Sequence, residues 1–285
     1  MGNDARTGPE MPGSVGDGRG TPMILRDLAQ GRAIHAPVAL VVAHPDDETL
    51  GVGARMVCLR QWILIHLTDG APTMPGGRGT IDAARRAVAA QRMHEMDAAL
   101  DVLGGRPQRR IAYGHPDQES ILHLPEIVTA LRRDLDGAAF VLTHAYENGH
   151  PDHDTAALAV HLACAPPAAR RKRATVIEFP SYHLGANGAR FGAFWRDAAR
   201  REWIATLGVH ERARKAKALE CFASQRDMLR NFPLDAERFR RAPDYDFSAP
   251  APPPAAWYDA QDWPIDSRTW LQIARQALVQ AGLAA

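Results

Sequence analysis

The chain has 285 residues, of which 46% are hydrophobic and 24% are charged, and its formal net charge is +1. This composition is typical of a globular protein with a substantial core, and the near-zero charge gives no general attraction to nucleic acid or acidic membranes. The three cysteines have no CxxC spacing, which argues against a disulfide framework or a zinc knuckle. The sequence has no run of roughly 18 apolar residues and no signal-peptide pattern. We therefore expect a soluble, cytoplasmic protein with no membrane span and no nucleic-acid partner.

The first two thirds of the sequence alternate between two kinds of pattern. Residues 1 to about 22 are rich in Gly and Pro and are expected to form a mobile tail. After them, short apolar runs typical of buried strands alternate with helical segments. The expected strands are residues 38–43, 62–67, 110–113, 138–143 and 175–179, and the expected helices are residues 49–59, 81–103, 121–135 and a segment that ends at 164. This alternation predicts a Rossmann-like three-layer α/β fold with a mostly parallel sheet.

The last third has a different pattern. Residues 209–229 are predicted to form a charged helix, a Pro-rich stretch follows within residues 232–265, and residues 267–281 are predicted to form an amphipathic helix that packs on the body. We therefore expect a tail (1–22), an α/β core (23–231), and a C-terminal extension (232–285) made of the Pro-rich segment and the last helix.

The segment AHPDDE at residues 43–48 follows directly on the first apolar run. Ligands of parallel α/β sheets bind at the carboxyl ends of the strands, so this segment stands where a site is expected. Burying unpaired charges is costly and a helix cap needs only one carboxylate, so the group indicates a metal or proton-transfer site. His44 and Asp46 would imitate the facial triad of non-haem iron oxygenases, whereas His44 and Asp47 would leave Asp46 free. Alternating strands and helices favour the second choice, because the oxygenase triad usually belongs to an all-β barrel. Glu48 is equally well explained as a first-turn helix acid and as a catalytic group.

A second motif, ENGHPDHD at residues 147–154, also follows an expected buried strand. Pro151 suits the first turn of a helix, and His150 and His153 are three residues apart, so both can face the same direction. One of them can complete a metal site while the other acts as an acid or an electrostatic group. A third His-Pro-Asp, at residues 115–117, follows a weaker strand and is a weaker candidate.

AHPDDE at 43–48 together with HPDH at 150–153 resembles the PIG-L/LmbE-type de-N-acetylases, which are zinc-dependent amidases that act on N-acetylglucosaminyl groups. Four further segments resemble parts of the same family, and the resemblance covers about residues 36–230. These segments are HLTDGAP (66–72), QRMHEMDAALDVLG (91–104), YGHPDQ (113–118) and KAKALECFASQ (215–225).

The resemblance implies roles for particular residues. It implies His44, Asp47 and His153 as metal ligands and Asp46 as the general base. It further implies that His150 stabilises the oxyanion, that Asp152 orients His150, and that Arg92 and Asp117 contact the sugar. The implied metal is Zn²⁺, although a His-His-Asp site also suits Fe²⁺. The implied substrate is a small molecule or glycoconjugate that carries an N-acylated amino sugar.

Alternatives stay open at this stage. Arg92 can instead pair with a helix neighbour such as Glu95, and Asp117 can cap a turn. For the whole chain, the rivals are the iron oxygenase and a non-catalytic glycan- or nucleotide-binding module, although LGVGARM at 50–56 lacks a full GxGxxG. His66 is expected to be a core histidine, and His183 is a candidate for lining a substrate cleft. Loops 72–80 and 181–205 are expected to select the substrate.

Overall fold

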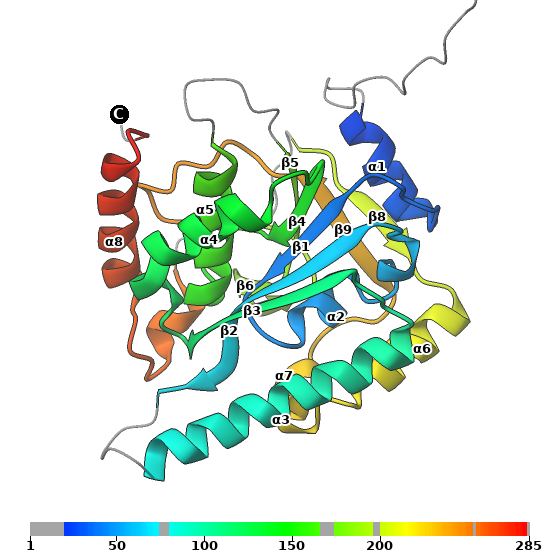
Figure 1. Cartoon of the computed structure of the whole chain (residues 1–285), viewed down its shortest axis with the longest axis horizontal. Helices are drawn as coiled ribbons and strands as arrows, with labels where there is room; N and C mark the ends of the chain where they lie inside the picture. Colours follow the sequence, from blue (N-terminus) through cyan, green and yellow to red (C-terminus); the bar gives the residue numbers. More distant parts are fainter. Residues whose placement is uncertain (1–19, 74–79, 166–173, 196–199, 253–254, 284–285) are drawn as a thin grey trace, which may run out of the picture.

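The computed structural model describes residues 20–73, 80–165, 174–195, 200–252 and 255–283 (Figure 1). The predicted tail lies outside these residues up to position 19, and so do parts of the loops expected to select the substrate, at 74–79 and 196–199. Within the described residues, seven strands form one sheet in the order β3-β2-β1-β4-β5-β9-β8. Strands β1 to β5 run parallel, while β9 is antiparallel to both β5 and β8. The strands are β1 (Val38–Val42), β2 (Trp62–Pro72), β3 (Arg109–Asp117), β4 (Phe140–His144), β5 (Thr175–Phe179), β8 (Trp203–Thr206) and β9 (Ala236–Arg241). A separate hairpin consists of β6 (Tyr182–Gly185) and β7 (Gly188–Phe191).

Helices cover both faces of the sheet. The α-helices are α1 (Gly20–Gln30), α2 (Asp47–Val52), α3 (Thr80–Leu103), α4 (Leu124–Asp134), α5 (Pro151–Cys164), α6 (Val209–Leu219), α7 (Arg226–Leu229) and α8 (Ser267–Gln280). Figure 1 shows α4, α5 and α8 on one side of the sheet and α3 and α6 on the other. None of these helices combines the length and the apolar character that a bilayer crossing requires.

Strand β1 explains why the sheet needs both helical layers. Leu40 and Val42 pack into the core cluster shared with α1, α2, α3 and α6. Ala39 and Val41 point the other way, into the cluster shared with α4, α5 and α8. Because alternate side chains of a strand face opposite sides, a strand buried on both sides must read as one continuous apolar run. The three-layer α/β fold with a mostly parallel sheet is confirmed.

Several elements differ from those predicted. The helix expected over 49–59 is the shorter α2, followed by a 3-10 turn at Met56–Cys58, and the helix expected over 209–229 ends at Leu219. Helix α1, the β6–β7 hairpin and strands β8 and β9 were not predicted. Strand β9 belongs to the segment 232–285 that we expected to be an extension, and it lies inside the main sheet. Its sequence, AERFRR, carries buried Glu237 and Arg240, so it has no apolar run to reveal it.

The topology places β1 and β4 side by side at the centre of the sheet. From β1 the chain continues outward to β2 and β3, whereas from β4 it continues the other way to β5. This is a topological switch point, where the loops at the carboxyl ends of the two central strands diverge and leave room for a site. AHPDDE follows β1 and ENGHPDHD follows β4, so both motifs lie at this point.

Candidate active site

Three loops meet at the carboxyl edge of the sheet, and each contains one non-glycine residue in a strained backbone conformation. Among the residues that the structure describes, the non-glycine residues with positive φ are Asp46 (φ 152°), Gln118 (φ 72°) and Asn148 (φ 57°). One lies after β1, one after β3 and one after β4. Such conformations cost of order 1–3 kcal/mol each and persist where surrounding contacts enforce them, typically at functional sites.

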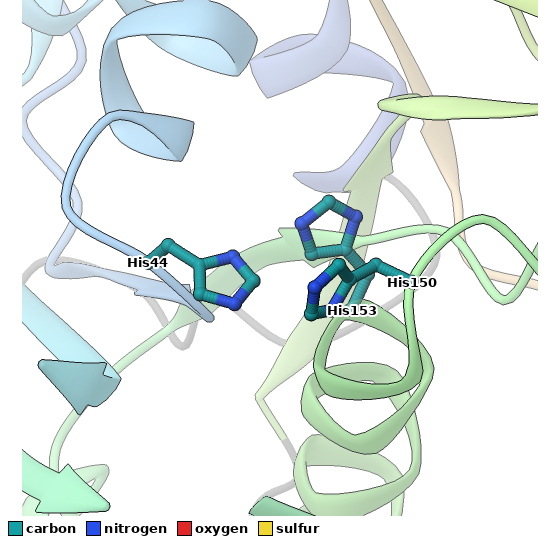
Figure 2. A group of neighbouring side chains, drawn as sticks. All are labelled: His44, His150 and His153. Carbon is teal, nitrogen blue, oxygen red and sulfur yellow. The ribbon is translucent and has the colours of Figure 1, made fainter. Parts of the chain in front are cut away.

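Asp47 joins the two histidine motifs. Its Oδ2 accepts a hydrogen bond from the His44 backbone N–H at 2.8 Å and lies 3.2 Å from His44 Nδ1. Its Oδ1 lies 3.3 Å from His153 Nε2. Figure 2 shows His44, on the loop after β1, pointing toward His150 and His153 at the start of α5. One buried carboxylate therefore contacts the two imidazoles that the family resemblance implies as its fellow metal ligands.

The second nitrogen of His44 also faces carboxylates. Nε2 lies 2.9 Å from Asp117 Oδ1 and 3.1 Å from Asp152 Oδ2. Burial lowers the pKa of His44, but Asp117, Asp152 and Asp47 together raise it well above its ordinary value. With Asp46 included, four carboxylates converge on this small region. Such a concentration of buried negative charge is stabilised by a bound cation.

His150 is held by the start of α5. It is the N-cap residue, and its Nδ1 accepts the Asp152 backbone N–H at 3.1 Å. Nε2 therefore carries the proton of the neutral ring, and it lies 3.6 Å from Asp117 Oδ1. Burial and the neighbouring His44 hold the pKa of His150 well below its ordinary value. His150 thus presents a neutral N–H donor to the site.

The Asp152 carboxylate makes contacts beyond His44. Its Oδ2 accepts the Gln118 backbone N–H at 2.6 Å, and its Oδ1 accepts the Ser120 backbone N–H and hydroxyl at 2.9 and 2.6 Å. Asp152 therefore fixes the loop that carries Asp117, while its backbone, rather than its side chain, hydrogen-bonds to His150.

Arg92 contacts the predicted base. Its Nη2 donates to Asp46 Oδ2 at 2.9 Å, and its Nη1 donates to Gly70 O at 3.0 Å. Burial raises the pKa of Asp46 above its ordinary value, although Arg92 acts in the opposite direction. The structure thus pairs Arg92 with Asp46 rather than with Glu95, which accepts from Ser224. The predicted sugar contact of Arg92 stays a prediction.

The donor set fits a divalent metal. Within the described part of the chain, ligand atoms of His44, His150 and His153 lie within 4.8 Å of one another, and so do those of Asp47, His144 and His153. His153 Nδ1 is buried without a hydrogen-bond partner. Imidazole nitrogens with one or more carboxylates are the ligands of catalytic zinc and of non-haem iron. A separate group, His115, His123 and Glu126, is more exposed.

Comparison with known proteins gives a family match for one segment of the chain. Residues 39–164 match the family model described as PIG-L, GlcNAc-PI de-N-acetylase. This segment is a PIG-L domain. It contains every site residue that the sequence predicted, from His44 to His153. No curated protein matches the chain.

Two solved structures share the fold of the chain. The A40926 pseudoaglycone deacetylase Dbv21 aligns with a TM-score of 0.51 and 19% identity, over 73% of this chain and 97% of that one. A triple mutant of a deacetylase of the teicoplanin biosynthetic pathway aligns with a TM-score of 0.52 and 20% identity, over 74% and 100%. The chain thus carries a deacetylase-family domain on a fold seen in known deacetylases.

Glu48 supports the first motif of the PIG-L domain from within. Its Oε2 accepts the Asp46 backbone N–H at 3.2 Å and lies 3.1 Å from His66 Nε2, while Oε1 accepts the Thr49 hydroxyl at 2.8 Å. Glu48 is fully buried. It stabilises the strained turn at Asp46, and His66 is the core histidine that the sequence indicated.

His144, at the end of β4, supports the second motif of the PIG-L domain. Its Nε2 accepts the Ala43 backbone N–H at 3.1 Å, and its Nδ1 lies 2.9 Å from Ser181 Oγ. The ring stacks on His153, with centroids 4.1 Å apart, and Nε2 lies 3.4 Å from Asp47 Oδ2. Because Nε2 already accepts a hydrogen bond, His144 orients the neighbouring residues rather than offering a free lone pair.

A further buried pair, Glu147 and His183, is linked to His144 through Ser181. His183 Nδ1 lies 3.2 Å from Glu147 Oε2, and Glu147 Oε1 accepts the Ser181 backbone N–H at 2.6 Å. His183 is fully buried, so it does not line a cleft as the sequence suggested. The only feature of the sequence that indicated a role for His144 was its position at the end of an expected strand. No feature of the sequence indicated that Glu147 pairs with His183.

Proposed function

We propose that the chain is a metal-dependent amide hydrolase that removes an N-acyl group, most simply acetyl, from a glucosamine-containing substrate. The observation that carries this proposal is Asp47, whose carboxylate contacts both His44 and His153 at the switch point of a PIG-L domain. Asp46, next to it in sequence, is held by Arg92 and is left out of that contact.

The metal would be held by His44, Asp47 and His153, which makes a three-ligand set of the kind found in catalytic rather than structural zinc sites. The bound ion supplies Lewis acidity and lowers the pKa of a coordinated water. Zinc is the proposed metal, and ferrous iron suits the same donors.

The side chains of the protein perform the proton transfers. Asp46 accepts a proton from the water that attacks the amide carbon, and Arg92 and Glu48 hold it in place for this. The Nε2–H of neutral His150 donates a hydrogen bond to the carbonyl oxygen as negative charge develops there. The C–N bond then breaks, the proton passes from Asp46 to the departing amine, and the carboxylic acid product leaves.

The proposed substrate is a small molecule or glycoconjugate with an N-acylated amino sugar. Its support is the family description, GlcNAc-PI de-N-acetylase, together with a structural neighbour described as a pseudoaglycone deacetylase. Asp117 is the proposed partner of a sugar hydroxyl, since it is the least buried of the four site carboxylates.

The structure does not favour the alternative in which the chain is an iron oxygenase. It required His44 and Asp46 as ligands, but Asp46 Oδ2 is bound to Arg92 and the sheet is mostly parallel. Measuring acetate release distinguishes a hydrolase from the alternative of a non-catalytic binding module.

The test is acetate release from N-acetylglucosaminides by the wild type, by Asp46→Asn and by His153→Ala, with the metal content of each measured. We expect a chelator to abolish release, Zn²⁺ to restore it, and His153→Ala to lose metal. A metal-loaded wild type that releases no acyl group from any N-acylated amino sugar contradicts the proposal. Turnover that requires oxygen and 2-oxoglutarate supports the oxygenase instead.

A further inference from the structure

The segment that precedes α8 is bound tightly to the second histidine motif, although it lies outside the residues that match the family. The Trp257 backbone N–H donates to Asn148 O at 2.8 Å. The Tyr258 hydroxyl lies 3.3 Å from Asp154 Oδ2. Chain positions more than a hundred residues apart thus form one structure at the candidate active site.

Helix α8 adds a second anchor at the same place. The Trp270 indole N–H donates to Pro151 O at 3.1 Å and to Thr155 Oγ1 at 3.0 Å, both in the first turns of α5. Asp259 accepts the Ser267 backbone N–H and hydroxyl at 2.7 and 2.6 Å, which closes the loop between them. The backbone around residue 263 is therefore fixed from both sides.

Trp263 lies inside this loop and contacts the site directly. Its ring centroid is 4.6 Å from that of His150, with the planes inclined at 51°. His150 is only 6% exposed, whereas Trp263 is half-buried, so part of the indole surface remains open beside a buried polar site. An aromatic ring partly open to solvent and held in a closed loop is a preorganised surface for an apolar ligand face.

Tyr182, another large aromatic side chain near the site histidines, is placed differently. Its ring is 5.5 Å from that of His153, but it is buried and surrounded by Phe191, Phe232 and Trp257. Tyr182 therefore packs in an aromatic cluster. Trp263 combines contact with a site histidine and open ring surface.

We propose that Trp263 is a substrate-contacting residue, and that its indole ring stacks on the apolar C–H face of the pyranose ring of an N-acylated amino sugar. This inference rests on the proposed function. The amide to be cleaved lies next to His150, and the sugar carbon that bears it is one bond away, so the pyranose ring falls within reach of a side chain in contact with His150. The substrate class is thereby narrowed to cyclic amino sugars, and part of the specificity is assigned to the C-terminal segment.

The test separates binding from chemistry by using Asp46→Asn as the background. N-acetylglucosamine is titrated by ligand-observed NMR into Asp46→Asn alone and into Asp46→Asn with Trp263→Ala or Trp263→Phe. A stacking contact of ordinary strength predicts an affinity loss of about tenfold for Trp263→Ala and a smaller loss for Trp263→Phe. The ring-opened reduced analogue, N-acetylglucosaminitol, has no pyranose face and should bind equally to all three. Trp203→Phe, at a half-buried tryptophan on β8, is the matched control and should change nothing.

The second readout is the steady-state kinetics of the wild type and of Trp263→Ala, both with Asp46 retained. Trp263→Ala should raise KM for an N-acetylglucosaminide about tenfold with little change in kcat. A fall in kcat at unchanged KM assigns Trp263 to positioning His150 and overturns the inference, as does an unchanged affinity in the NMR titration. Trp263→Leu replaces Trp263→Ala if the latter unfolds. A wild type that releases no acetate overturns the proposed function and this inference together, whereas normal turnover beside an unaffected Trp263→Ala overturns the inference alone.

Discussion

A buried ion pair supports the helix that carries Asp47, and its removal gives a measurable prediction. Lys215 on α6 and Glu237 on β9 are both almost fully buried, with Nζ 2.7 Å from Oε1. Lys215 also donates to Leu50 O at 2.6 Å, and Glu237 Oε1 accepts the Ala54 backbone N–H at 2.7 Å. The pair thus ties the end of α2 to the sheet.

The magnitude follows from the charge that each substitution leaves behind. Lys215→Met keeps most of the side-chain volume but orphans the Glu237 carboxylate, and breaking a buried pair in this way costs about 3–5 kcal/mol. Adding Glu237→Gln removes the orphaned charge and keeps an acceptor for Ala54, so about 2 kcal/mol should return. In the wild type, the same Glu237→Gln orphans an ammonium group and should destabilise the fold.

Urea unfolding followed by circular dichroism measures all four proteins of this cycle. The decisive quantity is the sign of the Glu237→Gln effect, which should be stabilising when it is added to Lys215→Met and destabilising when Lys215 is present. The same sign in both backgrounds, or a cost below about 1 kcal/mol for Lys215→Met, would refute the reasoning from buried charge.

Three further predictions concern the site and its supports. Asp47→Asn should lose bound metal, while Asp46→Asn should keep it and lose about 10²–10⁴-fold in kcat, as measured by metal analysis beside a rate assay; equal metal loss in both contradicts their separate roles. Gly149→Ala would place a Cβ 1.9 Å from Tyr182 O, so we expect a lower melting temperature and weaker metal binding, and an unchanged protein would show that the loop relaxes freely. Asp266 caps α8 by accepting a hydrogen bond from the Thr269 backbone N–H. Hydrogen bonding by Thr269 lowers the pKa of the Asp266 carboxyl. The stabilisation that this cap gives to the fold is present above the ordinary carboxyl pKa of about 4 and is lost as the pH falls through the lowered pKa. Asp266→Ala should therefore reduce the free energy of unfolding by about 1 kcal/mol at pH 7 and by little in strong acid. An equal reduction at both pH values argues against the cap.

The position of the candidate site was predictable because it depends on strand ends. The apolar run at 38–43 and the run at 138–143 each precede a His-Pro-Asp motif, and parallel strands bring their carboxyl ends to one edge. That argument needs only the order of apolar and polar residues. It placed His44, Asp47 and His153 in one region, where the structure has them in contact through Asp47.

Contacts that depend on buried polar pairing were not predictable in this way. Arg92 is three residues from Glu95 on one helix, but its partner, Asp46, lies forty-six residues earlier and is held at a φ that no pattern signals. Strand β9 has charged side chains at buried positions, because Glu237 and Arg240 find partners on other elements. No periodicity connects Trp263 with His150.

The helix boundaries failed for local reasons. The helix expected over 49–59 contains Gly51 and Gly53, which lower helix propensity, and α2 ends at Val52. Gly51 lies against Phe179, where a Cβ would approach the ring within 2.4 Å, so close packing of α2 on the sheet requires this glycine.

The strand order has a consequence for the synthesis of the chain. Strand β9 lies between β5 and β8, although it follows both in sequence. As the polypeptide leaves the ribosome, β5 therefore keeps an unpaired edge, and β8 has no neighbour in the main sheet, until residue 241 emerges. Throughout that interval the apolar side chains beside this edge, such as Ile177 and Phe179, lack part of their cover. Exposed strand edges attract other chains, so nascent chains that pause between residues 206 and 241 should be the ones that most need a chaperone.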